Sequence, residues 1–197
     1  NKLGFSKIIG TPHSYPGIYD NDEYTIKKSY NSLFKKLKEK FNIKYSSEYL
    51  LENSIIEKAK NKSLLTLKEN YVLVEFSYLS APNNLDEIIF QIQINDYIPI
   101  IAHPERYRFY HNNFKKYSEL KKKGCKFQIN LLSTTGYYGK DILKISDKLL
   151  GKGYIDFVGS DIHNIQHINC FNRKIKINNL KNLKKAINNN FIFDDNF

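Results

Sequence analysis

The sequence predicts an α/β fold in which parallel strands are covered by helices, either as an open sheet or closed into a barrel. Apolar runs with the composition of strands alternate with lysine-rich stretches whose apolar residues recur at helical spacing. A polar or ionisable residue stands at the end of each apolar run, and successive members of this series are 27 to 35 residues apart, close to one strand and helix each. No Pro- or Ser-rich linker interrupts the 197 residues, so we expect a single domain over 1–197.

Six strands are expected, because short runs rich in Ile, Val, Phe and Tyr are separated by more polar stretches. In chain order they are 5–10, 43–49, 71–77, 98–103, 126–132 and 154–160. The stretches between them predict helices, because their apolar residues recur every three or four positions. These are 24–41, 84–95, 114–123 and 140–152, followed by a last helix and short tail over 178–197.

The residues at the strand ends are the candidates for chemistry. They are His13, Glu48, Glu75, His103, Asn130, Asp161 and His163. Asp161 and His163 are two positions apart, so strand alternation points them the same way. In a parallel barrel the carboxyl ends of the strands meet at one rim, where the active sites of such barrels lie. Since His with carboxylates is the ligand set of divalent metal centres, we expect a metal site there.

Each strand-end residue also has a purely structural explanation. A Glu late in a strand, such as Glu75, is often a paired carboxylate. His13 beside Pro12 could cap a turn, and His103 could form a loop salt bridge with Glu105. The recurrence of three His and three carboxylates at strand ends is what favours the metal site.

The composition limits the partners. The net charge is +11, but it comes almost entirely from Lys spread along the chain, and no nucleic-acid-binding motif is present, so we expect no nucleic-acid partner. Cys125 and Cys170 are too isolated for a disulfide framework or a thiolate zinc site. No apolar run approaches the roughly 18 residues of a membrane span, and no signal peptide opens the chain. We therefore expect a cytoplasmic protein with no membrane insertion.

Arginine placement indicates phosphate. Two of the three Arg, Arg106 and Arg108, directly follow the HPE motif, and Arg binds phosphate oxygens bidentately. An ion pair of Arg106 with Glu105 or Glu75 that only orders the loop is the alternative. Tyr15 and Tyr19 follow His13 and are expected to form a mobile flap whose rings stack on substrate, or else a plain surface turn.

The motifs TPH, SSEYLL, VLVEFSYL, IAHPERY, FQINLLSTTGYYG and GSDIH together resemble, in order and spacing, the PHP (polymerase and histidinol phosphatase) superfamily. They are most similar to its manganese-dependent protein-tyrosine phosphatases of bacterial capsular and exopolysaccharide biosynthesis. The resemblance implies a distorted (β/α)7 TIM-like barrel with up to three divalent metal ions, for which manganese is expected and iron, zinc or magnesium are alternatives. It also implies that the substrate is the phosphotyrosine-bearing tail of a polysaccharide-assembly kinase. A homo-oligomer of the protein is compatible with the resemblance.

The resemblance also assigns residues. Its metal-binding positions match His13, Glu48, Glu75, His103, Asp161 and His163, and its phosphate-contacting Arg matches Arg106. The expected reaction is metal-assisted hydrolysis of a phosphomonoester, in which Arg106 stabilises the transferring phosphoryl group and Asp161 or His163 could protonate the leaving oxygen.

Two departures accompany the resemblance. The family begins with a strand carrying an Asp-X-His-X-His motif, and this sequence begins about where the second strand should, so we expect the first strand to be missing from it. A further Arg of the family lies just beyond the Asp-X-His motif, where only Arg173 could serve. Three alternatives stay open: a phosphatase of small esters such as histidinol phosphate, a non-catalytic relic that binds the kinase tail, and a basic nucleic-acid-binding domain.

Overall fold

The computed structural model describes residues 3–5, 7–37 and 41–194. The chain divides into two compact units. The first comprises 1–77, 81–99 and 193–197, and the second comprises 78–80 and 100–192. The predicted positions 38–40 and 195–197 lie outside the described residues.

The strands of the first unit are short and parallel. β1 (Lys7–Gly10) pairs with β3 (Asn42–Tyr45). β4 (Glu48–Leu50) pairs on one side with β2 (His13–Ser14) and on the other with β5 (Tyr71–Glu75). Because His13 is in register with Glu48, and Leu50 with Glu75, this sheet brings residues from three chain segments together.

The predicted strand 43–49 is wrong as a single strand, because β3 and β4 belong to different sheets. Buried Ser46 and Ser47 separate them, and the Ser47 hydroxyl donates to the Pro12 carbonyl at 3.0 Å. Pro12, which has no N–H to donate to a ladder, lies between β1, which falls within the predicted strand 5–10, and the additional short strand β2. Backbone bonds still join the two segments here, because the N–H groups of Ser46 and Glu48 donate to the Gly10 and Pro12 carbonyls at 2.8 and 3.0 Å, and the Ser47 hydroxyl adds a side-chain bond.

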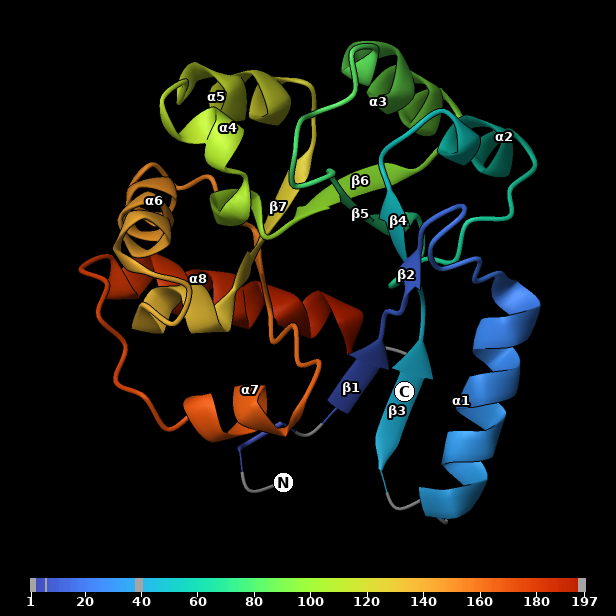
Figure 1. Ribbon diagram of the computed structural model, residues 1–197, viewed down its shortest axis with the longest axis horizontal. Coiled ribbons are helices and arrows are strands. Elements are labelled where there is room, and N and C mark those ends of the chain that lie inside the picture. Colours follow the sequence, from blue (N-terminus) through green and yellow to red (C-terminus); the bar gives the residue numbers. More distant parts are fainter. Residues whose placement is uncertain (1–2, 6, 38–40, 195–197) are drawn as a thin grey trace. The chain divides into compact units, whose positions relative to one another are not determined.

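Three helices accompany these strands. α1 (Glu23–Leu37) begins after Asp22, whose carboxylate accepts from the Thr25 N–H at 2.8 Å while the Thr25 hydroxyl accepts from the Asp22 N–H at 3.0 Å. α1 lies beside β3 (Figure 1), and the two make contacts in the fold. α2 (Ser54–Lys60) and α3 (Leu85–Ile94) pack against each other. α3 matches the predicted helix, whereas α2 is too short for its periodicity to be recognised.

In the second unit, β7 (Lys126–Asn130) pairs in parallel with β6 (Ile98–Ala102) and with β8 (Phe157–Gly159). The Asn190 side chain completes the pairing of β8, because its amide accepts from the Val158 N–H at 3.0 Å and donates to the Val158 carbonyl at 2.7 Å. The predicted parallel α/β organisation is therefore confirmed within each unit.

The helices of the second unit match the sequence prediction where they are long. These are α5 (Lys115–Lys122), α6 (Lys140–Gly151) and α8 (Leu180–Asn189). α6 buries Ile142, Ile145 and Leu149 and exposes its Lys residues, as its spacing predicted. Short helical segments that the sequence did not predict connect the longer elements. They are η1 (Pro104–Arg106), α4 (Arg108–His111), η2 (Leu131–Thr135), α7 (Ile165–Cys170) and η3 (Asn190–Phe193).

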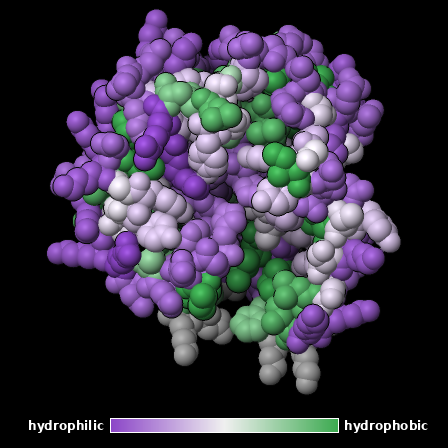
Figure 2. Space-filling model, in the orientation of Figure 1, coloured by the Kyte–Doolittle hydropathy of each residue, from purple (hydrophilic) through white to green (hydrophobic). Residues whose placement is uncertain are grey.

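Hydrophilic residues predominate on the face shown in Figure 2, in keeping with the Lys-rich composition. Among the described residues, none of the helices combines the length and the apolarity that crossing a bilayer requires.

Candidate metal centre and phosphate-binding residues

The first unit gathers three of the predicted metal ligands. His13 opens β2, Glu48 opens β4 and Glu75 closes β5. His13 Nδ1 lies 2.6 Å from Glu75 Oε1 and 3.3 Å from Glu48 Oε2. One potential ligand atom from each residue lies within 4.8 Å of the other two. The sequence predicted this convergence, although it placed His13 and Glu48 at strand ends rather than at the starts of short second strands.

The chemistry of this cluster fits a divalent cation. The Glu75 side chain is fully buried and that of Glu48 is 6% exposed. Two carboxylates withdrawn from water so close together carry a large electrostatic cost unless positive charge lies between them. An imidazole and two carboxylates are nitrogen and oxygen donors of the kind that zinc, manganese and iron accept. The three residues present therefore suit a metal ion.

A tight turn follows His13. Tyr15 and Tyr19 form a small antiparallel bridge, with the Tyr15 N–H donating to the Tyr19 carbonyl at 2.9 Å and the reverse bond at 2.8 Å. Gly17 adopts a φ of 77°, which favours glycine, and its N–H donates to Asp20 Oδ1 at 2.7 Å. The rings of Tyr15 and Tyr19 have their centroids 5.3 and 5.6 Å from that of His13. Two aromatic side chains thus border the candidate metal centre.

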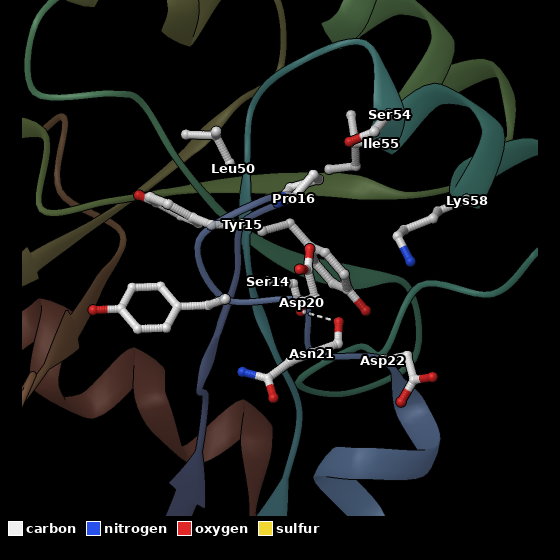
Figure 3. Close-up of a pocket in the computed structure, with 12 residues that line it drawn as sticks. Ser14, Tyr15, Pro16, Asp20, Asn21, Asp22, Leu50, Ser54, Ile55 and Lys58 are labelled. Atoms are coloured by element: carbon white, nitrogen blue, oxygen red, sulfur yellow. Dashed lines mark hydrogen bonds between the residues drawn. The ribbon is translucent and has the colours of Figure 1, made fainter.

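A cavity of about 180 Å³ lies between this turn and the β4–α2 segment (Figure 3). Pro16, Leu50 and Ile55 supply apolar walls, and Asp20 and Lys58 supply charge. The Ser14 hydroxyl donates to the Asn21 carbonyl at 3.1 Å and joins the two ends of the turn. The turn is therefore held by its own hydrogen bonds and lines one side of a cavity.

In the second unit, the predicted phosphate-binding Arg106 contacts the predicted ligand Asp161. Arg106 Nη1 lies 2.7 Å from Asp161 Oδ2. Asn130 Nδ2 donates to the same oxygen at 2.7 Å, and His163 Nδ1 lies 3.3 Å from Asp161 Oδ1. Oδ2 thus accepts two N–H groups, while Oδ1 faces His163. The alternative pairing of Arg106 with Glu105 is wrong, because the guanidinium pairs with Asp161 and the Glu105 carboxylate has other partners.

Two of these residues have a left-handed backbone. His103, after β6, has a φ of 33°, and Asp161, after β8, has a φ of 49°. Residues other than glycine adopt such angles at a cost of about 1–3 kcal/mol and do so most often at functional sites. The ion pair of Asp161 with Arg106 is one of the contacts that hold its conformation.

Buried Glu105 holds Asn130, one member of this group, in place by a hydrogen bond. Its Oε1 accepts from the Asn130 N–H at 3.0 Å and from the Ser133 hydroxyl at 2.6 Å. Burial raises the pKa of Glu105, against the lowering effect of the Ser133 hydrogen bond. Glu105 therefore orders Asn130, which in turn orients Asp161.

Aromatic rings surround Arg106. The centroid of the Tyr138 ring lies 4.5 Å and that of Tyr78 5.1 Å from the guanidinium carbon. The Tyr138 hydroxyl accepts from Asn130 Nδ2 at 3.1 Å, and burial raises the pKa of Tyr138 to about 12, so its phenol is protonated at neutral pH. Tyr78 also stacks on the His103 ring at 5.9 Å and 13°.

Among the described residues, neither the Arg108 nor the Arg173 side chain forms a hydrogen bond or ion pair with this group, whereas His167 lies next to it. Arg108 lies on α4 with an exposed side chain that forms no hydrogen bond or ion pair among the described residues. Arg173 lies 5.2 Å from the Tyr137 ring. His167 has its Nδ1 3.1 Å from the Asp161 carbonyl oxygen, next to the predicted ligands.

Sequence reasoning overlooked two residues of the second unit, Tyr78 and Tyr138, which had no assigned role. Glu105 was considered only as an ion-pair partner of His103 or Arg106, and Asn130 was noted only as a strand-end polar residue. Tyr138 lies in the TTGYYG stretch, which was used for the resemblance but not for the site.

Comparison with known proteins agrees with the sequence resemblance. Tyrosine-protein phosphatase YwqE of Bacillus subtilis (strain 168) is 31% identical over 169 residues, which cover 84% of this chain and 66% of YwqE. The putative tyrosine-protein phosphatase CapC of Staphylococcus aureus is 34% identical over 164 residues, or 80% of this chain and 64% of CapC. The chain thus spans slightly less than two thirds of either relative.

A solved structure and a family model agree with these relatives. A chain from the crystal structures of YwqE from Bacillus subtilis and CpsB from Streptococcus pneumoniae, described as unique metal-dependent tyrosine phosphatases, superposes with a TM-score of 0.80 at 27% identity. The superposition covers 99% of this chain and 80% of that one. The family model described as "Capsular polysaccharide synthesis, CpsB/CapC" matches residues 1–190. The predicted resemblance to capsular tyrosine phosphatases is confirmed, and the chain belongs to the CpsB/CapC family of capsular polysaccharide synthesis.

Proposed function

We propose that this protein is a metal-dependent protein-tyrosine phosphatase of capsule or exopolysaccharide biosynthesis. The observation that carries the proposal is the buried cluster of His13, Glu48 and Glu75, a set of donors suited to a divalent cation. The names of YwqE, CapC and CpsB as tyrosine phosphatases support it.

His13, Glu48 and Glu75 would hold one cation. His103, Asp161 and His163 complete the proposed ligand set on the strength of the family resemblance, for up to three ions with manganese as the first choice. Such ions, when bound, supply Lewis acidity toward the phosphoryl oxygens and activation of water at neutral pH.

Arg106 would bind and stabilise the phosphoryl group. Its ion pair with Asp161 uses Nη1, and the guanidinium has five N–H groups, so others are available to phosphoryl oxygens. Because charge on those oxygens changes during transfer, a planar donor held in place by Asp161 and two aromatic rings lowers the barrier.

As an alternative to its role as a metal ligand, either His163 or Asp161 would supply the proton for the leaving tyrosine oxygen. If Asp161 supplies it, the proton must sit on Oδ1, because Oδ2 accepts from Arg106 and Asn130. His163 is exposed and adjacent to Oδ1, so it is equally placed for this role. Tyr15 and Tyr19 beside His13 would contact the substrate as the mobile flap, and Arg108 would contact more distant parts of it.

The proposed location of the protein is the cytoplasm, and its proposed substrate is the phosphotyrosine-bearing tail of a polysaccharide-assembly kinase. The Lys-rich surface would attract a phosphorylated, acidic segment. We further propose that residues 1–197 act as one PHP-type phosphatase domain with the strand order of a distorted (β/α)7 barrel, and that a homo-oligomer is compatible with this role.

The deciding experiment measures phosphate release from a phosphotyrosine peptide by this chain, with manganese and then with excess chelator. Turnover that the chelator abolishes, and that His13→Ala lacks, supports the proposal. Equal or faster hydrolysis of histidinol phosphate would instead indicate a small-ester phosphatase. Binding of the peptide without phosphate release would indicate a non-catalytic binding protein.

A further inference from the structure

Tyr78 presents a large aromatic surface to solvent beside the candidate phosphate-binding residue. Tyr78 is 51% exposed although its ring contacts Arg106, His103 and Tyr107. The ring centroid lies 5.1 Å from the Arg106 guanidinium carbon. The same ring stacks nearly parallel to His103, at 13° and 5.9 Å. The ring is thus held among Arg106, His103 and Tyr107, and about half of the residue's surface is exposed to solvent.

The contacts of Arg106 restrict how an anion can approach it. Tyr78 and Tyr138 lie over the guanidinium at cation–π distances, and Nη1 is bonded to Asp161. A phosphate therefore has to bind through the remaining N–H groups, which lie in the plane of the guanidinium. The organic group of a bound phosphate ester must then lie close to the rings that flank that plane.

The two flanking rings differ in their freedom to meet a ligand. Tyr138 is partly buried, and its hydroxyl accepts from Asn130 at 3.1 Å. Less of its surface is therefore accessible to a ligand. Tyr78 is half exposed, and aromatic rings attract other rings in offset or edge-to-face geometry. Of the two, Tyr78 is the ring that a bound aryl group can reach.

We propose that Tyr78 is a specificity-determining residue that packs against the aromatic ring of an aryl phosphate bound at Arg106. This inference rests on the proposed function for the binding of phosphate at Arg106, and it adds the reason why an aryl phosphate is preferred to an alkyl phosphate. Ring-on-ring contact of this kind raises affinity by roughly three- to tenfold.

The test compares two phosphonates that the enzyme cannot hydrolyse, phenylphosphonate and methylphosphonate, by titration calorimetry on the manganese-loaded chain. The unaltered chain is expected to bind the phenyl compound more tightly by roughly three- to tenfold. Tyr78→Phe keeps the ring and should keep this preference. Tyr78→Leu keeps apolar bulk without an aromatic ring and should lose most of it, and Tyr78→Ala should lose all of it.

Leu79 supplies a matched control, because it is the next residue and is 89% exposed. Leu79→Ala should leave the preference for phenylphosphonate unchanged. Circular dichroism melts show whether each variant is folded, and if Tyr78→Ala does not fold, the comparison of Tyr78→Phe with Tyr78→Leu still decides.

The inference is overturned if the unaltered chain binds both phosphonates equally or binds neither. The same preference for phenylphosphonate in the unaltered chain and in all three Tyr78 variants overturns it too. So does tighter binding of both compounds by Tyr78→Ala, because Tyr78 would then only block the site. Turnover of phosphotyrosine peptide, measured separately, tells the two proposals apart. Turnover without aryl preference refutes the role of Tyr78 alone, and aryl preference without turnover refutes the phosphatase alone.

Discussion

Arg106 and Asp161 form an ion pair with 2.7 Å between Nη1 and Oδ2, although 55 residues separate them in the chain. The pair joins the loop after β6 to the loop after β8. Asn130, at the end of β7, donates to the same carboxylate oxygen. Three successive strands of the second unit thus contribute one residue each to a single hydrogen-bonded group.

Replacing Arg106 by Lys should lower kcat for a phosphotyrosine peptide by at least about 100-fold, because a single ammonium cannot both hold Asp161 and bind the phosphoryl group. Steady-state kinetics with manganese measure this. Lys115→Ala, an exposed change of charge on α5, serves as control and should leave kcat unaltered. A kcat within threefold of the unaltered chain for Arg106→Lys would contradict the assigned role.

Asn130→Asp should lower kcat/KM by roughly 10- to 100-fold, the range typical of residues that orient a ligand. The substitution keeps the side-chain oxygen that accepts from the Leu132 N–H at 3.0 Å. It replaces the N–H donor to Asp161 with a second carboxylate oxygen, which repels the first. Asn130→Ser, which retains a donor, should recover part of the loss; no recovery would point to general disruption of the fold.

Glu75→Gln should weaken manganese binding by more than the roughly 10- to 100-fold typical of residues behind the ligands, since Glu75 supplies a ligand atom itself. Titration calorimetry with manganese alone measures this and needs no substrate. Glu87→Gln on the exposed side of α3 is the matched control. Unchanged manganese affinity in Glu75→Gln would exclude the His13, Glu48 and Glu75 cluster as a metal site.

Asp147 should stabilise the fold above pH 4. Partial burial acts to raise its pKa, but hydrogen bonds from Asn179 and Asn178 outweigh it and hold the pKa below the usual 3.8. Because the folded-state pKa is depressed, the stabilisation is complete above the unfolded value of 3.8 and is lost as the pH falls through the folded value. Asp147→Asn should cost about 1 kcal/mol at pH 7, allowing for solvent screening.

Urea unfolding of Asp147→Asn and the unaltered chain between pH 3 and 7 checks this, with the exposed Asp141→Asn as control. The difference in unfolding free energy should shrink as the pH falls below 4. A difference that stays constant down to pH 3 would show that Asp147 contributes by packing rather than by charge.

Only one of the two free thiols should react readily. Burial raises the pKa of the Cys125 thiol to about 12, so almost no thiolate exists at pH 8, and the side chain is 1% exposed. Cys170 is half-buried on α7. A thiol-reactive dye at pH 8 should therefore label about one thiol per folded chain and two after unfolding. Rapid labelling of the Cys170→Ser variant would contradict this.

The sequence by itself determined the fold class, most of the long elements and the residue types of the candidate centre. Apolar runs and helical spacing report local burial, which is why α3, α5, α6 and the apolar parts of β5 and β7 lie where they were predicted. The convergence of His13, Glu48 and Glu75 followed from the recurrence of ligand residues at strand ends.

The tertiary structure alone decided how those residues are held. Periodicity cannot show that Ser46 and Ser47 divide one apolar run into strands of two different sheets, because their hydrogen-bond partners, Leu65 and Pro12, lie on other segments. Nor can it show that Asn130 orients Asp161 or that Tyr78 covers Arg106. Those contacts depend on the register of parallel strands and the path of the loops after them, which bring together side chains that local sequence leaves unrelated.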